Sequence, residues 1–238
     1  MKTVRMLLAA ASLSAGQALA HGGLADLSVY DRTEARRLQV YWHEGRAYVV
    51  GKPGNEYQVS LRNRLQEELL AVVSVDGVNV ITGQTANPSQ SGYVLAPRGG
   101  MDIQGWRRSL AQTAAFYFTS LPESYAARTG RPDNVGVLGV ALFRKKAVSP
   151  PIGIDRPSPR ADAQGRAAEG SIGTGHGRHE TSYAYYTSLE RATSAPAEVI
   201  TLYYDSRANL VARGVIQDQP RIAAHPSAFP GFVADPPR

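Results

Sequence analysis

Apolar and polar residues alternate along the first half of the chain with the two-residue period of β-strands. Residues 37–42 (RLQVYW) and 57–62 (YQVSLR) place apolar side chains on one face and polar side chains on the other, which predicts half-buried antiparallel strands. Residues 69–75 (LLAVVSV) form a nearly continuous apolar run rich in valine, and this pattern predicts a more deeply buried strand. The first half of the chain therefore favours a sheet with one solvated face.

A hairpin is predicted where the strand 69–75 ends. Asp76 and Gly77 separate it from a second apolar run at residues 78–81, and an Asp-Gly pair supplies the positive φ angles of a two-residue hairpin turn. Further strands, about ten residues apart and separated by turn residues, are predicted over 92–96, 101–106, 114–119 and 135–143. This spacing predicts an all-β fold, an immunoglobulin-like antiparallel β-sandwich.

One short helix interrupts the strands. Ser120, Pro122 and Glu123 combine a capping box with a proline in the first turn, and Gly130 follows as a stop signal. The sequence therefore predicts a helix over residues 121–128.

The composition changes after the sandwich domain predicted over residues 21–144. Residues 145–172 are rich in Pro, Gly, Ala, Arg and Ser, and such a segment buries too little apolar surface to offset its ordering entropy, so we expect a flexible linker or loop. A C-terminal three-stranded β meander is predicted within residues 173–218, with strands over 182–191, 198–204 and 210–216. A meander of this size is marginal alone, so it should pack on the sandwich, followed by an irregular tail over 219–238.

Five tyrosines lie in the first two of these C-terminal strands. They are Tyr183, Tyr185, Tyr186, Tyr203 and Tyr204. Their alternation predicts packing between neighbouring strands in preference to stacking on a ligand.

Residues 1–20 have the three parts of a signal peptide. Lys2 and Arg5 precede an apolar stretch, and residues 18–20 (ALA) form a cleavage site. The stretch is shorter than the roughly 20 residues that a transmembrane helix needs, and no later stretch qualifies. We therefore expect a protein that is cleaved after Ala20, exported to the periplasm or secreted, and without a transmembrane segment.

The net charge limits the partners to be expected, and the cysteine content limits how the fold can be stabilised. The leader carries two positive and no negative side chains, so cleavage lowers the formal charge from +6 to +4 and the length from 238 to 218 residues. That excess suits anionic polymers or lipid headgroups, whereas nucleic-acid binding calls for a concentrated basic face and is not expected. The chain has no cysteine, so its core must supply the cohesion that disulfides give many exported proteins.

Several segments resemble a family of uncharacterised exported proteins of Gram-negative bacteria. The resemblance covers most of the chain after residue 20 and rests on residues 72–83 (VVSVDGVNVITG), 92–97 (GYVLAP), 105–109 (GWRRS), 114–132 (AAFYFTSLPESYAARTGRP) and 180–216 (ETSYAYYTSLERATSAPAEVITLYYDSRANLVARGVI). The resemblance implies export and a shared architecture. It transfers no activity, ligand or catalytic residue.

The residue after the expected cleavage site suggests one metal hypothesis. A chain that begins with His21 presents an α-amine and an imidazole on one residue, and a second histidine would complete the three-nitrogen set that suits tetragonal Cu(II). The candidate second ligands are His43, His176 and His179. The alternative interpretation is a mobile terminus on which a histidine stands by chance.

The other candidate metal-binding and catalytic motifs in the sequence are incomplete. Residues 173–180 (GTGHGRHE) place two histidines beside a carboxylate, as a zinc or nickel site would, but a flexible glycine-rich loop leading into a strand explains the same residues. The glycines lack the ending of a phosphate loop, and the G-x-S-x-G, H-E-x-x-H and S-x-x-K motifs of hydrolases are missing from the sequence. Glu67 and Glu68 are adjacent, so on a strand they would face opposite sides and could not act on one glycosidic bond. We therefore assign no catalytic residue.

Aromatic and guanidinium groups in connecting segments indicate a binding surface. They are Trp106, Arg107, Arg108, Tyr125, Arg128 and Arg131. Arginine beside an aromatic face binds carboxylates or sugars, although Trp106 would serve equally as a core anchor. The sequence favours a non-enzymatic binding or accessory module of the bacterial envelope, with another envelope protein or an anionic glycan as partner. The alternative is a copper-binding or copper-dependent oxidative protein that uses His21.

Overall fold

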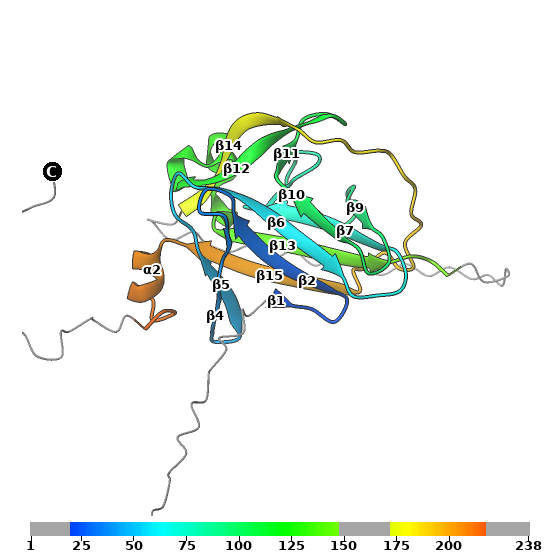
Figure 1. Ribbon diagram of the computed structural model, residues 1–238, viewed down its shortest axis with the longest axis horizontal. Helices are drawn as coiled ribbons and strands as arrows, with labels where there is room; N and C mark the ends of the chain where they lie inside the picture. Colours follow the sequence, from blue (N-terminus) through cyan, green and yellow to red (C-terminus); the bar gives the residue numbers. More distant parts are fainter. Residues whose placement is uncertain (1–19, 148–171, 218–238) are drawn as a thin grey trace, which may run out of the picture.

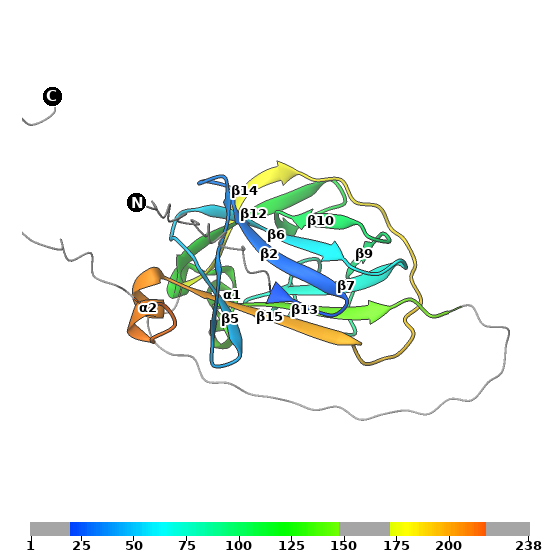
Figure 2. The same ribbon diagram turned by 60° about the horizontal axis from the view of Figure 1, so that its bottom comes forward.

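The computed structural model describes residues 20–147 and 172–217, which form two β-sheets packed face to face (Figures 1 and 2). In the first sheet the order is β1-β2-β6-β12, with β11 and β14 on the two edges of β12, β10 beside β6 and β3 beside β2. Its strands are β1 (Ala20–His21), β2 (Ala25–Asp31), β3 (Arg36–Arg37), β6 (Glu56–Asn63), β10 (Gly100–Ile103), β11 (Gly105–Arg107), β12 (Gln112–Ser120) and β14 (Ile172–Thr181).

The second sheet has the order β4-β5-β15-β13-β7-β8, with β9 beside β7. Its strands are β4 (Val40–His43), β5 (Arg46–Val50), β7 (Leu69–Val75), β8 (Val78–Asn79), β9 (Tyr93–Leu95), β13 (Val137–Arg144) and β15 (Glu198–Asp205). Neighbouring strands are antiparallel except β5 and β15, which are parallel. The last strand of the described chain therefore completes the middle of this sheet.

The long strands alternate between the sheets along the chain. β2, β6, β12 and β14 belong to the first sheet, whereas β5, β7, β13 and β15 belong to the second. An all-β sandwich was predicted and is confirmed. Its second sheet is mixed, because β5 and β15 run parallel.

The core lies between the sheets and consists of the inward residues of both. Tyr57 stacks on Phe116 and Phe118 at centroid distances of 5.3 and 4.3 Å, and Leu138 and Leu202 approach from the opposite sheet. Each of these side chains is almost completely buried. Burial of one such side chain contributes about 1.5–3 kcal/mol, so the core supplies the cohesion that a chain without cysteine needs.

Local patterning predicted several elements well. The strand predicted over 69–75 is β7, and the hairpin after it forms with Val75 opposite Val78. Asp76 and Gly77 have φ angles of 52° and 71°, as this type of turn requires.

The predicted helix over 121–128 divides into two short pieces. Leu121–Glu123 is a 3₁₀ helix and Tyr125–Arg128 is the α-helix α1. The break occurs at Ser124, which has an extended conformation and accepts a hydrogen bond from the Ala127 amide at 3.1 Å. The capping serine is therefore Ser124, because Ser120 makes no side-chain cap. A second 3₁₀ helix, Pro132–Asn134, follows.

The predicted C-terminal meander is wrong. β14 and β15 belong to different sheets, residues 182–190 form no strand, and the third predicted strand is the α-helix α2 (Arg207–Ala212). Ser206 caps this helix by accepting from the Asn209 amide at 3.2 Å. Leu210 of α2 and the residues after it pack on Tyr48 on the outer face of the second sheet. Their apolar side chains are therefore buried without forming a strand.

The glycine-rich loop predicted over 173–180 is also wrong, because all of it lies within the strand β14. A Cβ at Gly175 would lie 2.1 Å from the ring of Tyr117 on β12, and one at Gly173 would lie 2.6 Å from Cβ of Ser124. The glycines therefore provide room for side chains that cross the strand, which a sequence pattern alone does not reveal.

The predicted leader (residues 1–20, except Ala20), most of the linker 145–172 and the tail 219–238 lie outside the described residues. Within the described residues, none of the helices is long and apolar enough to span a membrane.

Candidate functional site

Four of the six residues predicted for binding line one shallow pocket. Trp106 and Arg107 come from β11, Arg108 follows them, Tyr125 comes from α1, and His176 on β14 joins them. We call this site the basic pocket. Its volume is about 220 Å³, and it is lined by Val80, Thr82, Gly83, Trp106, Arg107, Arg108, Tyr125 and His176. None of these residues is acidic.

Trp106 forms the inner wall of the basic pocket and is a core anchor. Its side chain is 4% exposed, its Nε1 donates to the Gly175 carbonyl at 3.1 Å, and its ring meets Phe116 edge-on at 5.2 Å. A buried indole N–H needs such a partner. The ring therefore fixes β11 against β14 and leaves little of its surface to a ligand.

His176 stands beside the ring of Tyr125. The two rings stack at 5.5 Å, and the ring of His179 lies 6.4 Å from His176 and nearly perpendicular to it. Partial burial lowers the pKa of His176, and the positive charge of Arg108 lowers it further. His176 is therefore neutral at pH 7 and becomes cationic in more acidic solution.

Arg108 and Arg128 give the site its positive charge. A nitrogen of the Arg108 guanidinium lies 2.9 Å from Nε2 of His179, and since a guanidinium can only donate, the imidazole nitrogen accepts. Among residues 20–147 and 172–217, neither arginine forms an ion pair with a carboxylate. Both are exposed, and Arg128 is close enough to lower the pKa of His176.

Two other predicted arginines are occupied by the fold. Arg107 donates to the carbonyl and hydroxyl of Ser182 and lies over the ring of Tyr93 at 5.9 Å. Arg131 donates to the Gly83 carbonyl at 3.1 Å and to the Thr129 hydroxyl at 2.9 Å. Of the six predicted residues, Trp106 is therefore a core anchor, Arg107 and Arg131 are bound within the fold, and Tyr125 is an aromatic wall of the pocket. Arg108 and Arg128 are cations without a carboxylate partner among the described residues.

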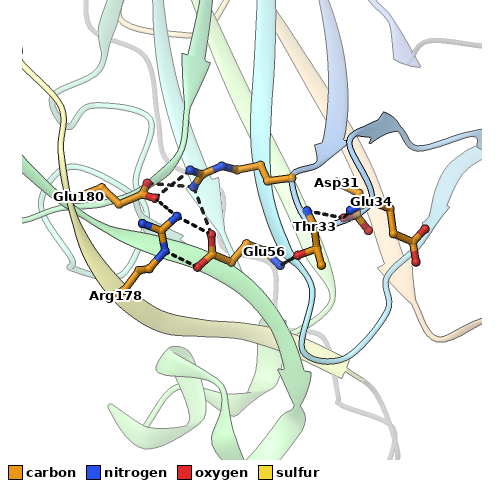
Figure 3. A network of polar contacts seen from close by, with 7 residues as sticks. Asp31, Thr33, Glu34, Glu56, Arg178 and Glu180 are labelled. Carbon is orange, nitrogen blue, oxygen red and sulfur yellow. Dashed lines mark hydrogen bonds and ion pairs between the residues drawn. The ribbon is translucent and has the colours of Figure 1, made fainter.

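A second arginine cluster, on the other side of β14, is neutralised (Figure 3). Arg32 and Glu180 form two hydrogen bonds of 2.9 and 2.8 Å, and Arg178 and Glu56 form two of 2.8 and 3.0 Å. The pairs Arg178–Glu180 (2.6 Å) and Arg32–Glu56 (3.7 Å) close the circuit. We call these four residues the ion-pair ring. Glu180, the carboxylate that the sequence suggested as a metal ligand, is therefore bound by two arginines.

The four histidines proposed for copper lie on three strands: His21 on β1, His43 on β4, and His176 and His179 on β14. β1 and β14 are separated by β2, β6 and β12, so the backbone of His21 lies about 19 Å from that of His176 and His179 at about 4.8 Å per strand. His43 is on β4 of the other sheet, where Ala20 and Trp42 line the same small cavity. Within the described residues, no three His, Asp or Glu side chains are placed to hold a metal ion.

A buried polar cluster joins the two sheets at Asp76. Its carboxylate accepts hydrogen bonds from the Tyr204 hydroxyl at 2.5 Å, the Thr174 amide at 2.7 Å and the Gly136 amide at 2.9 Å. The Thr174 hydroxyl is bonded in turn to Tyr204 and Tyr57. Burial raises the pKa of Asp76 to about 6, although these hydrogen bonds oppose the shift. The sequence indicated only a turn at Asp76, because its partners are distant along the chain.

The sequence did not predict a second cavity, which is larger than the basic pocket. It has a volume of about 610 Å³ and lies beside β9, β10, β11 and the extended segment after β14. Three tyrosines of that segment, Tyr183, Tyr185 and Tyr186, are 76%, 88% and 90% exposed, so the packing between strands predicted for them is wrong. The cluster of tyrosines in the sequence was the available signal.

Comparison with known protein families, curated proteins and solved structures finds no match to this chain.

Proposed function

We propose that the protein is an exported, non-enzymatic binding module of the bacterial envelope, and that its basic pocket binds the acidic groups of a glycan. The observation that carries this proposal is that Arg108 and His176 line a pocket with no acidic lining residue, and that Arg128 is close enough to lower the pKa of His176. Elsewhere on β14, the ion-pair ring provides a carboxylate for each arginine. An unpaired guanidinium beside an aromatic ring is well suited to a carboxylate, which it can bind with two parallel hydrogen bonds.

The pocket favours a small acidic group over a long polyanion. Its volume of about 220 Å³ is below the range of about 300–1,000 Å³ typical of pockets that enclose whole organic ligands. A sugar carboxylate would meet Arg108 while the sugar ring lies against Tyr125. His176 supports a binding role because its neighbour is an arginine, whereas a catalytic imidazole is usually oriented by a carboxylate.

Binding is tested by calorimetric titration of the chain without its leader with tetragalacturonate, a carboxylated oligosaccharide. We expect binding that weakens as salt rises to about 0.15 M, because exposed charges are then screened. The double variant Arg108→Gln/Arg128→Gln should bind at least tenfold more weakly while its stability changes by about 0.5 kcal/mol or less.

The matched control is Arg37→Gln/Arg62→Gln. These two exposed arginines line a different pocket, together with Asp26 and Asp102, and their replacement changes the net charge equally. Equal weakening in both double variants would mean that only net charge matters, and the proposed site would be wrong. The absence of binding to the unaltered chain would refute the proposal directly.

Export is supported by the pattern of residues 1–20. Its test is N-terminal sequencing of the protein recovered from the periplasm or medium of a bacterium that expresses the whole chain. We expect His21 as the first residue. Recovery of uncleaved chain from the cytoplasm alone would contradict export.

A further inference from the structure

The larger cavity has the size and lining of a ligand site, and we call it the tyrosine groove. Its volume of about 610 Å³ lies within the range of pockets that enclose organic ligands. Figure 1 shows the segment after β14 arching across the open end of the sandwich, beside β9 and β10, before it reaches β15. Residues 182–187 of this segment form one side of the groove, and β9, β10 and β11 form the other.

Thr113 is the observation that points to a ligand. This residue lines the groove and is 1% exposed, and its hydroxyl is the one buried side-chain polar atom of the described residues that has no hydrogen-bond partner. Burial of an unpaired hydroxyl is unfavourable, and native structures contain few such groups. A hydroxyl of a bound molecule would give Thr113 the partner that the protein does not provide.

The walls of the groove are aromatic and apolar. Tyr93, Leu110, Tyr183 and Tyr185 all line the groove, and the last two are mostly solvent-exposed. Tyrosine combines a large apolar face with a polar tip, which is why it is frequent at binding surfaces. The groove thus offers flat rings at its rim and, in its wall, one buried hydroxyl that has no partner among the described residues.

The side of the groove that carries the tyrosines is held in place at its start. The amides of Ser182 and Ala184 donate to the carbonyls of Ala111 and Leu110 at 2.9 and 2.7 Å, and Arg107 binds Ser182 from the opposite wall. A groove that is formed before the ligand arrives costs less ordering entropy on binding.

The two charged side chains that line the groove, Asp102 and Arg107, have opposite sign, and each is hydrogen-bonded within the protein. Asp102 accepts from the Ser60 hydroxyl at 2.6 Å, and Arg107 is bound to Ser182. The Gln104 amide makes no side-chain hydrogen bond to the described residues and is available. The site therefore suits an uncharged molecule that has both apolar faces and hydroxyl groups.

We propose that the tyrosine groove binds an uncharged carbohydrate, with sugar C–H faces on the exposed tyrosine rings and a sugar hydroxyl bonded to Thr113. A sugar has both of the required surfaces on each ring. An extended peptide would instead pair its backbone with the free edge of β9 and would leave Thr113 without a specific role. This proposal does not depend on the basic pocket, with which the groove shares Arg107 alone.

The test is calorimetric titration of the unaltered chain with maltohexaose, cellohexaose and chitohexaose. We expect at least one of them to bind in the millimolar range or more tightly. Thr113→Val keeps the shape of the side chain and removes the hydroxyl, so it should weaken that binding by about fivefold to tenfold. Without sugar, the same variant should melt at the same or a higher temperature, because it removes an unpaired buried hydroxyl.

Matched variants separate this site from its neighbours. Thr119→Val is the control on the same strand, outside the groove, and it should leave sugar binding unchanged. Tyr183→Ala/Tyr185→Ala should weaken sugar binding without loss of folding, whereas Arg108→Gln/Arg128→Gln should weaken tetragalacturonate binding alone.

Four outcomes would overturn the proposal: no binding of any of the three sugars, binding that Thr113→Val leaves unchanged, a lower melting temperature for Thr113→Val, or binding of an alternating Val-Thr heptapeptide in place of the sugars. The last result would assign the groove to strand addition at β9. If the unaltered chain does not bind tetragalacturonate, only the proposal for the basic pocket is refuted.

Discussion

Strand β14 takes part in two regions whose polar groups differ in how completely they are paired. Thr174, at one end, belongs to the cluster around Asp76, where each buried oxygen has a partner. His176, further along, lines the basic pocket, which contains no acidic lining residue, and Arg108 of that pocket donates to His179. The first arrangement holds the two sheets together, and the second leaves charge available to a ligand. Completeness of pairing therefore distinguishes structural polar groups from candidate binding groups in this protein.

The largest expected effect tests the structural side of this comparison. Asp76→Ala would leave the Tyr204 hydroxyl and the amides of Thr174 and Gly136 without their acceptor, and each unpaired buried group costs about 1–3 kcal/mol. We expect a loss of about 3 kcal/mol or more in the free energy of unfolding, measured in urea. Asp133→Ala, at an exposed position, should change it little. A small effect at Asp76 would show that the cluster does not support the fold.

The pH dependence of stability gives a second test of the structural role of Asp76. Folding raises the pKa of Asp76 from 3.8 to about 6, so the folded state holds a proton that the unfolded state releases. Its contribution to stability is complete below about pH 4 and is lost as the pH rises through 6, a change of about 3 kcal/mol.

Asp76→Asn cannot titrate, and asparagine tolerates the positive φ angle of this position. The stability advantage of the unaltered chain over this variant should therefore shrink between about pH 4 and pH 7. An advantage that is constant across this interval would mean that the Asp76 pKa is unshifted. Urea unfolding of both chains at each pH measures it.

An intermediate effect is expected at the ion-pair ring. Arg32→Gln removes two hydrogen bonds to Glu180, whose side chain is 8% exposed, and we expect a loss of about 1 kcal/mol in the free energy of unfolding. Tetragalacturonate binding should remain unchanged, because this arginine is already neutralised. If Arg32→Gln weakens that binding as much as Arg108→Gln/Arg128→Gln does, pairing with carboxylates does not distinguish the two arginine clusters.

The smallest expected effect concerns His176. Its lowered pKa means that its positive charge appears only below about pH 6.5, and a bound carboxylate would favour the charged form. Tetragalacturonate should therefore bind about twofold to fivefold more tightly near pH 5 than near pH 8, by an electrostatic gain of less than about 1 kcal/mol. His176→Gln should abolish this difference, as calorimetry at both pH values would show. An unaltered pH profile in the variant would remove His176 from the site.

Elements with a strong local signal were predictable, and elements that depend on distant partners were not. The hairpin at Asp76 and Gly77 follows from two residues whose φ angles are set locally. β14 was missed because its glycines are required by Tyr117 on another strand. The basic pocket was partly predictable, since an arginine and a tyrosine between predicted strands indicated binding at Arg108 and Tyr125. The hydrogen bond from Arg107 to Ser182 was not, because it spans 75 positions of the chain.

The sequence by itself determined that the protein is built of strands with a buried apolar face, and that no disulfide holds them. Periodicity decides these features because each depends on neighbours within a few residues. The tertiary structure alone decided which polar groups are paired. Asp76 is bonded to Tyr204, Arg32 is bonded to Glu180, and the Thr113 hydroxyl has no partner among the described residues. Such pairings depend on which strands the fold brings together, and hydrogen bonds and ion pairs act only at short range.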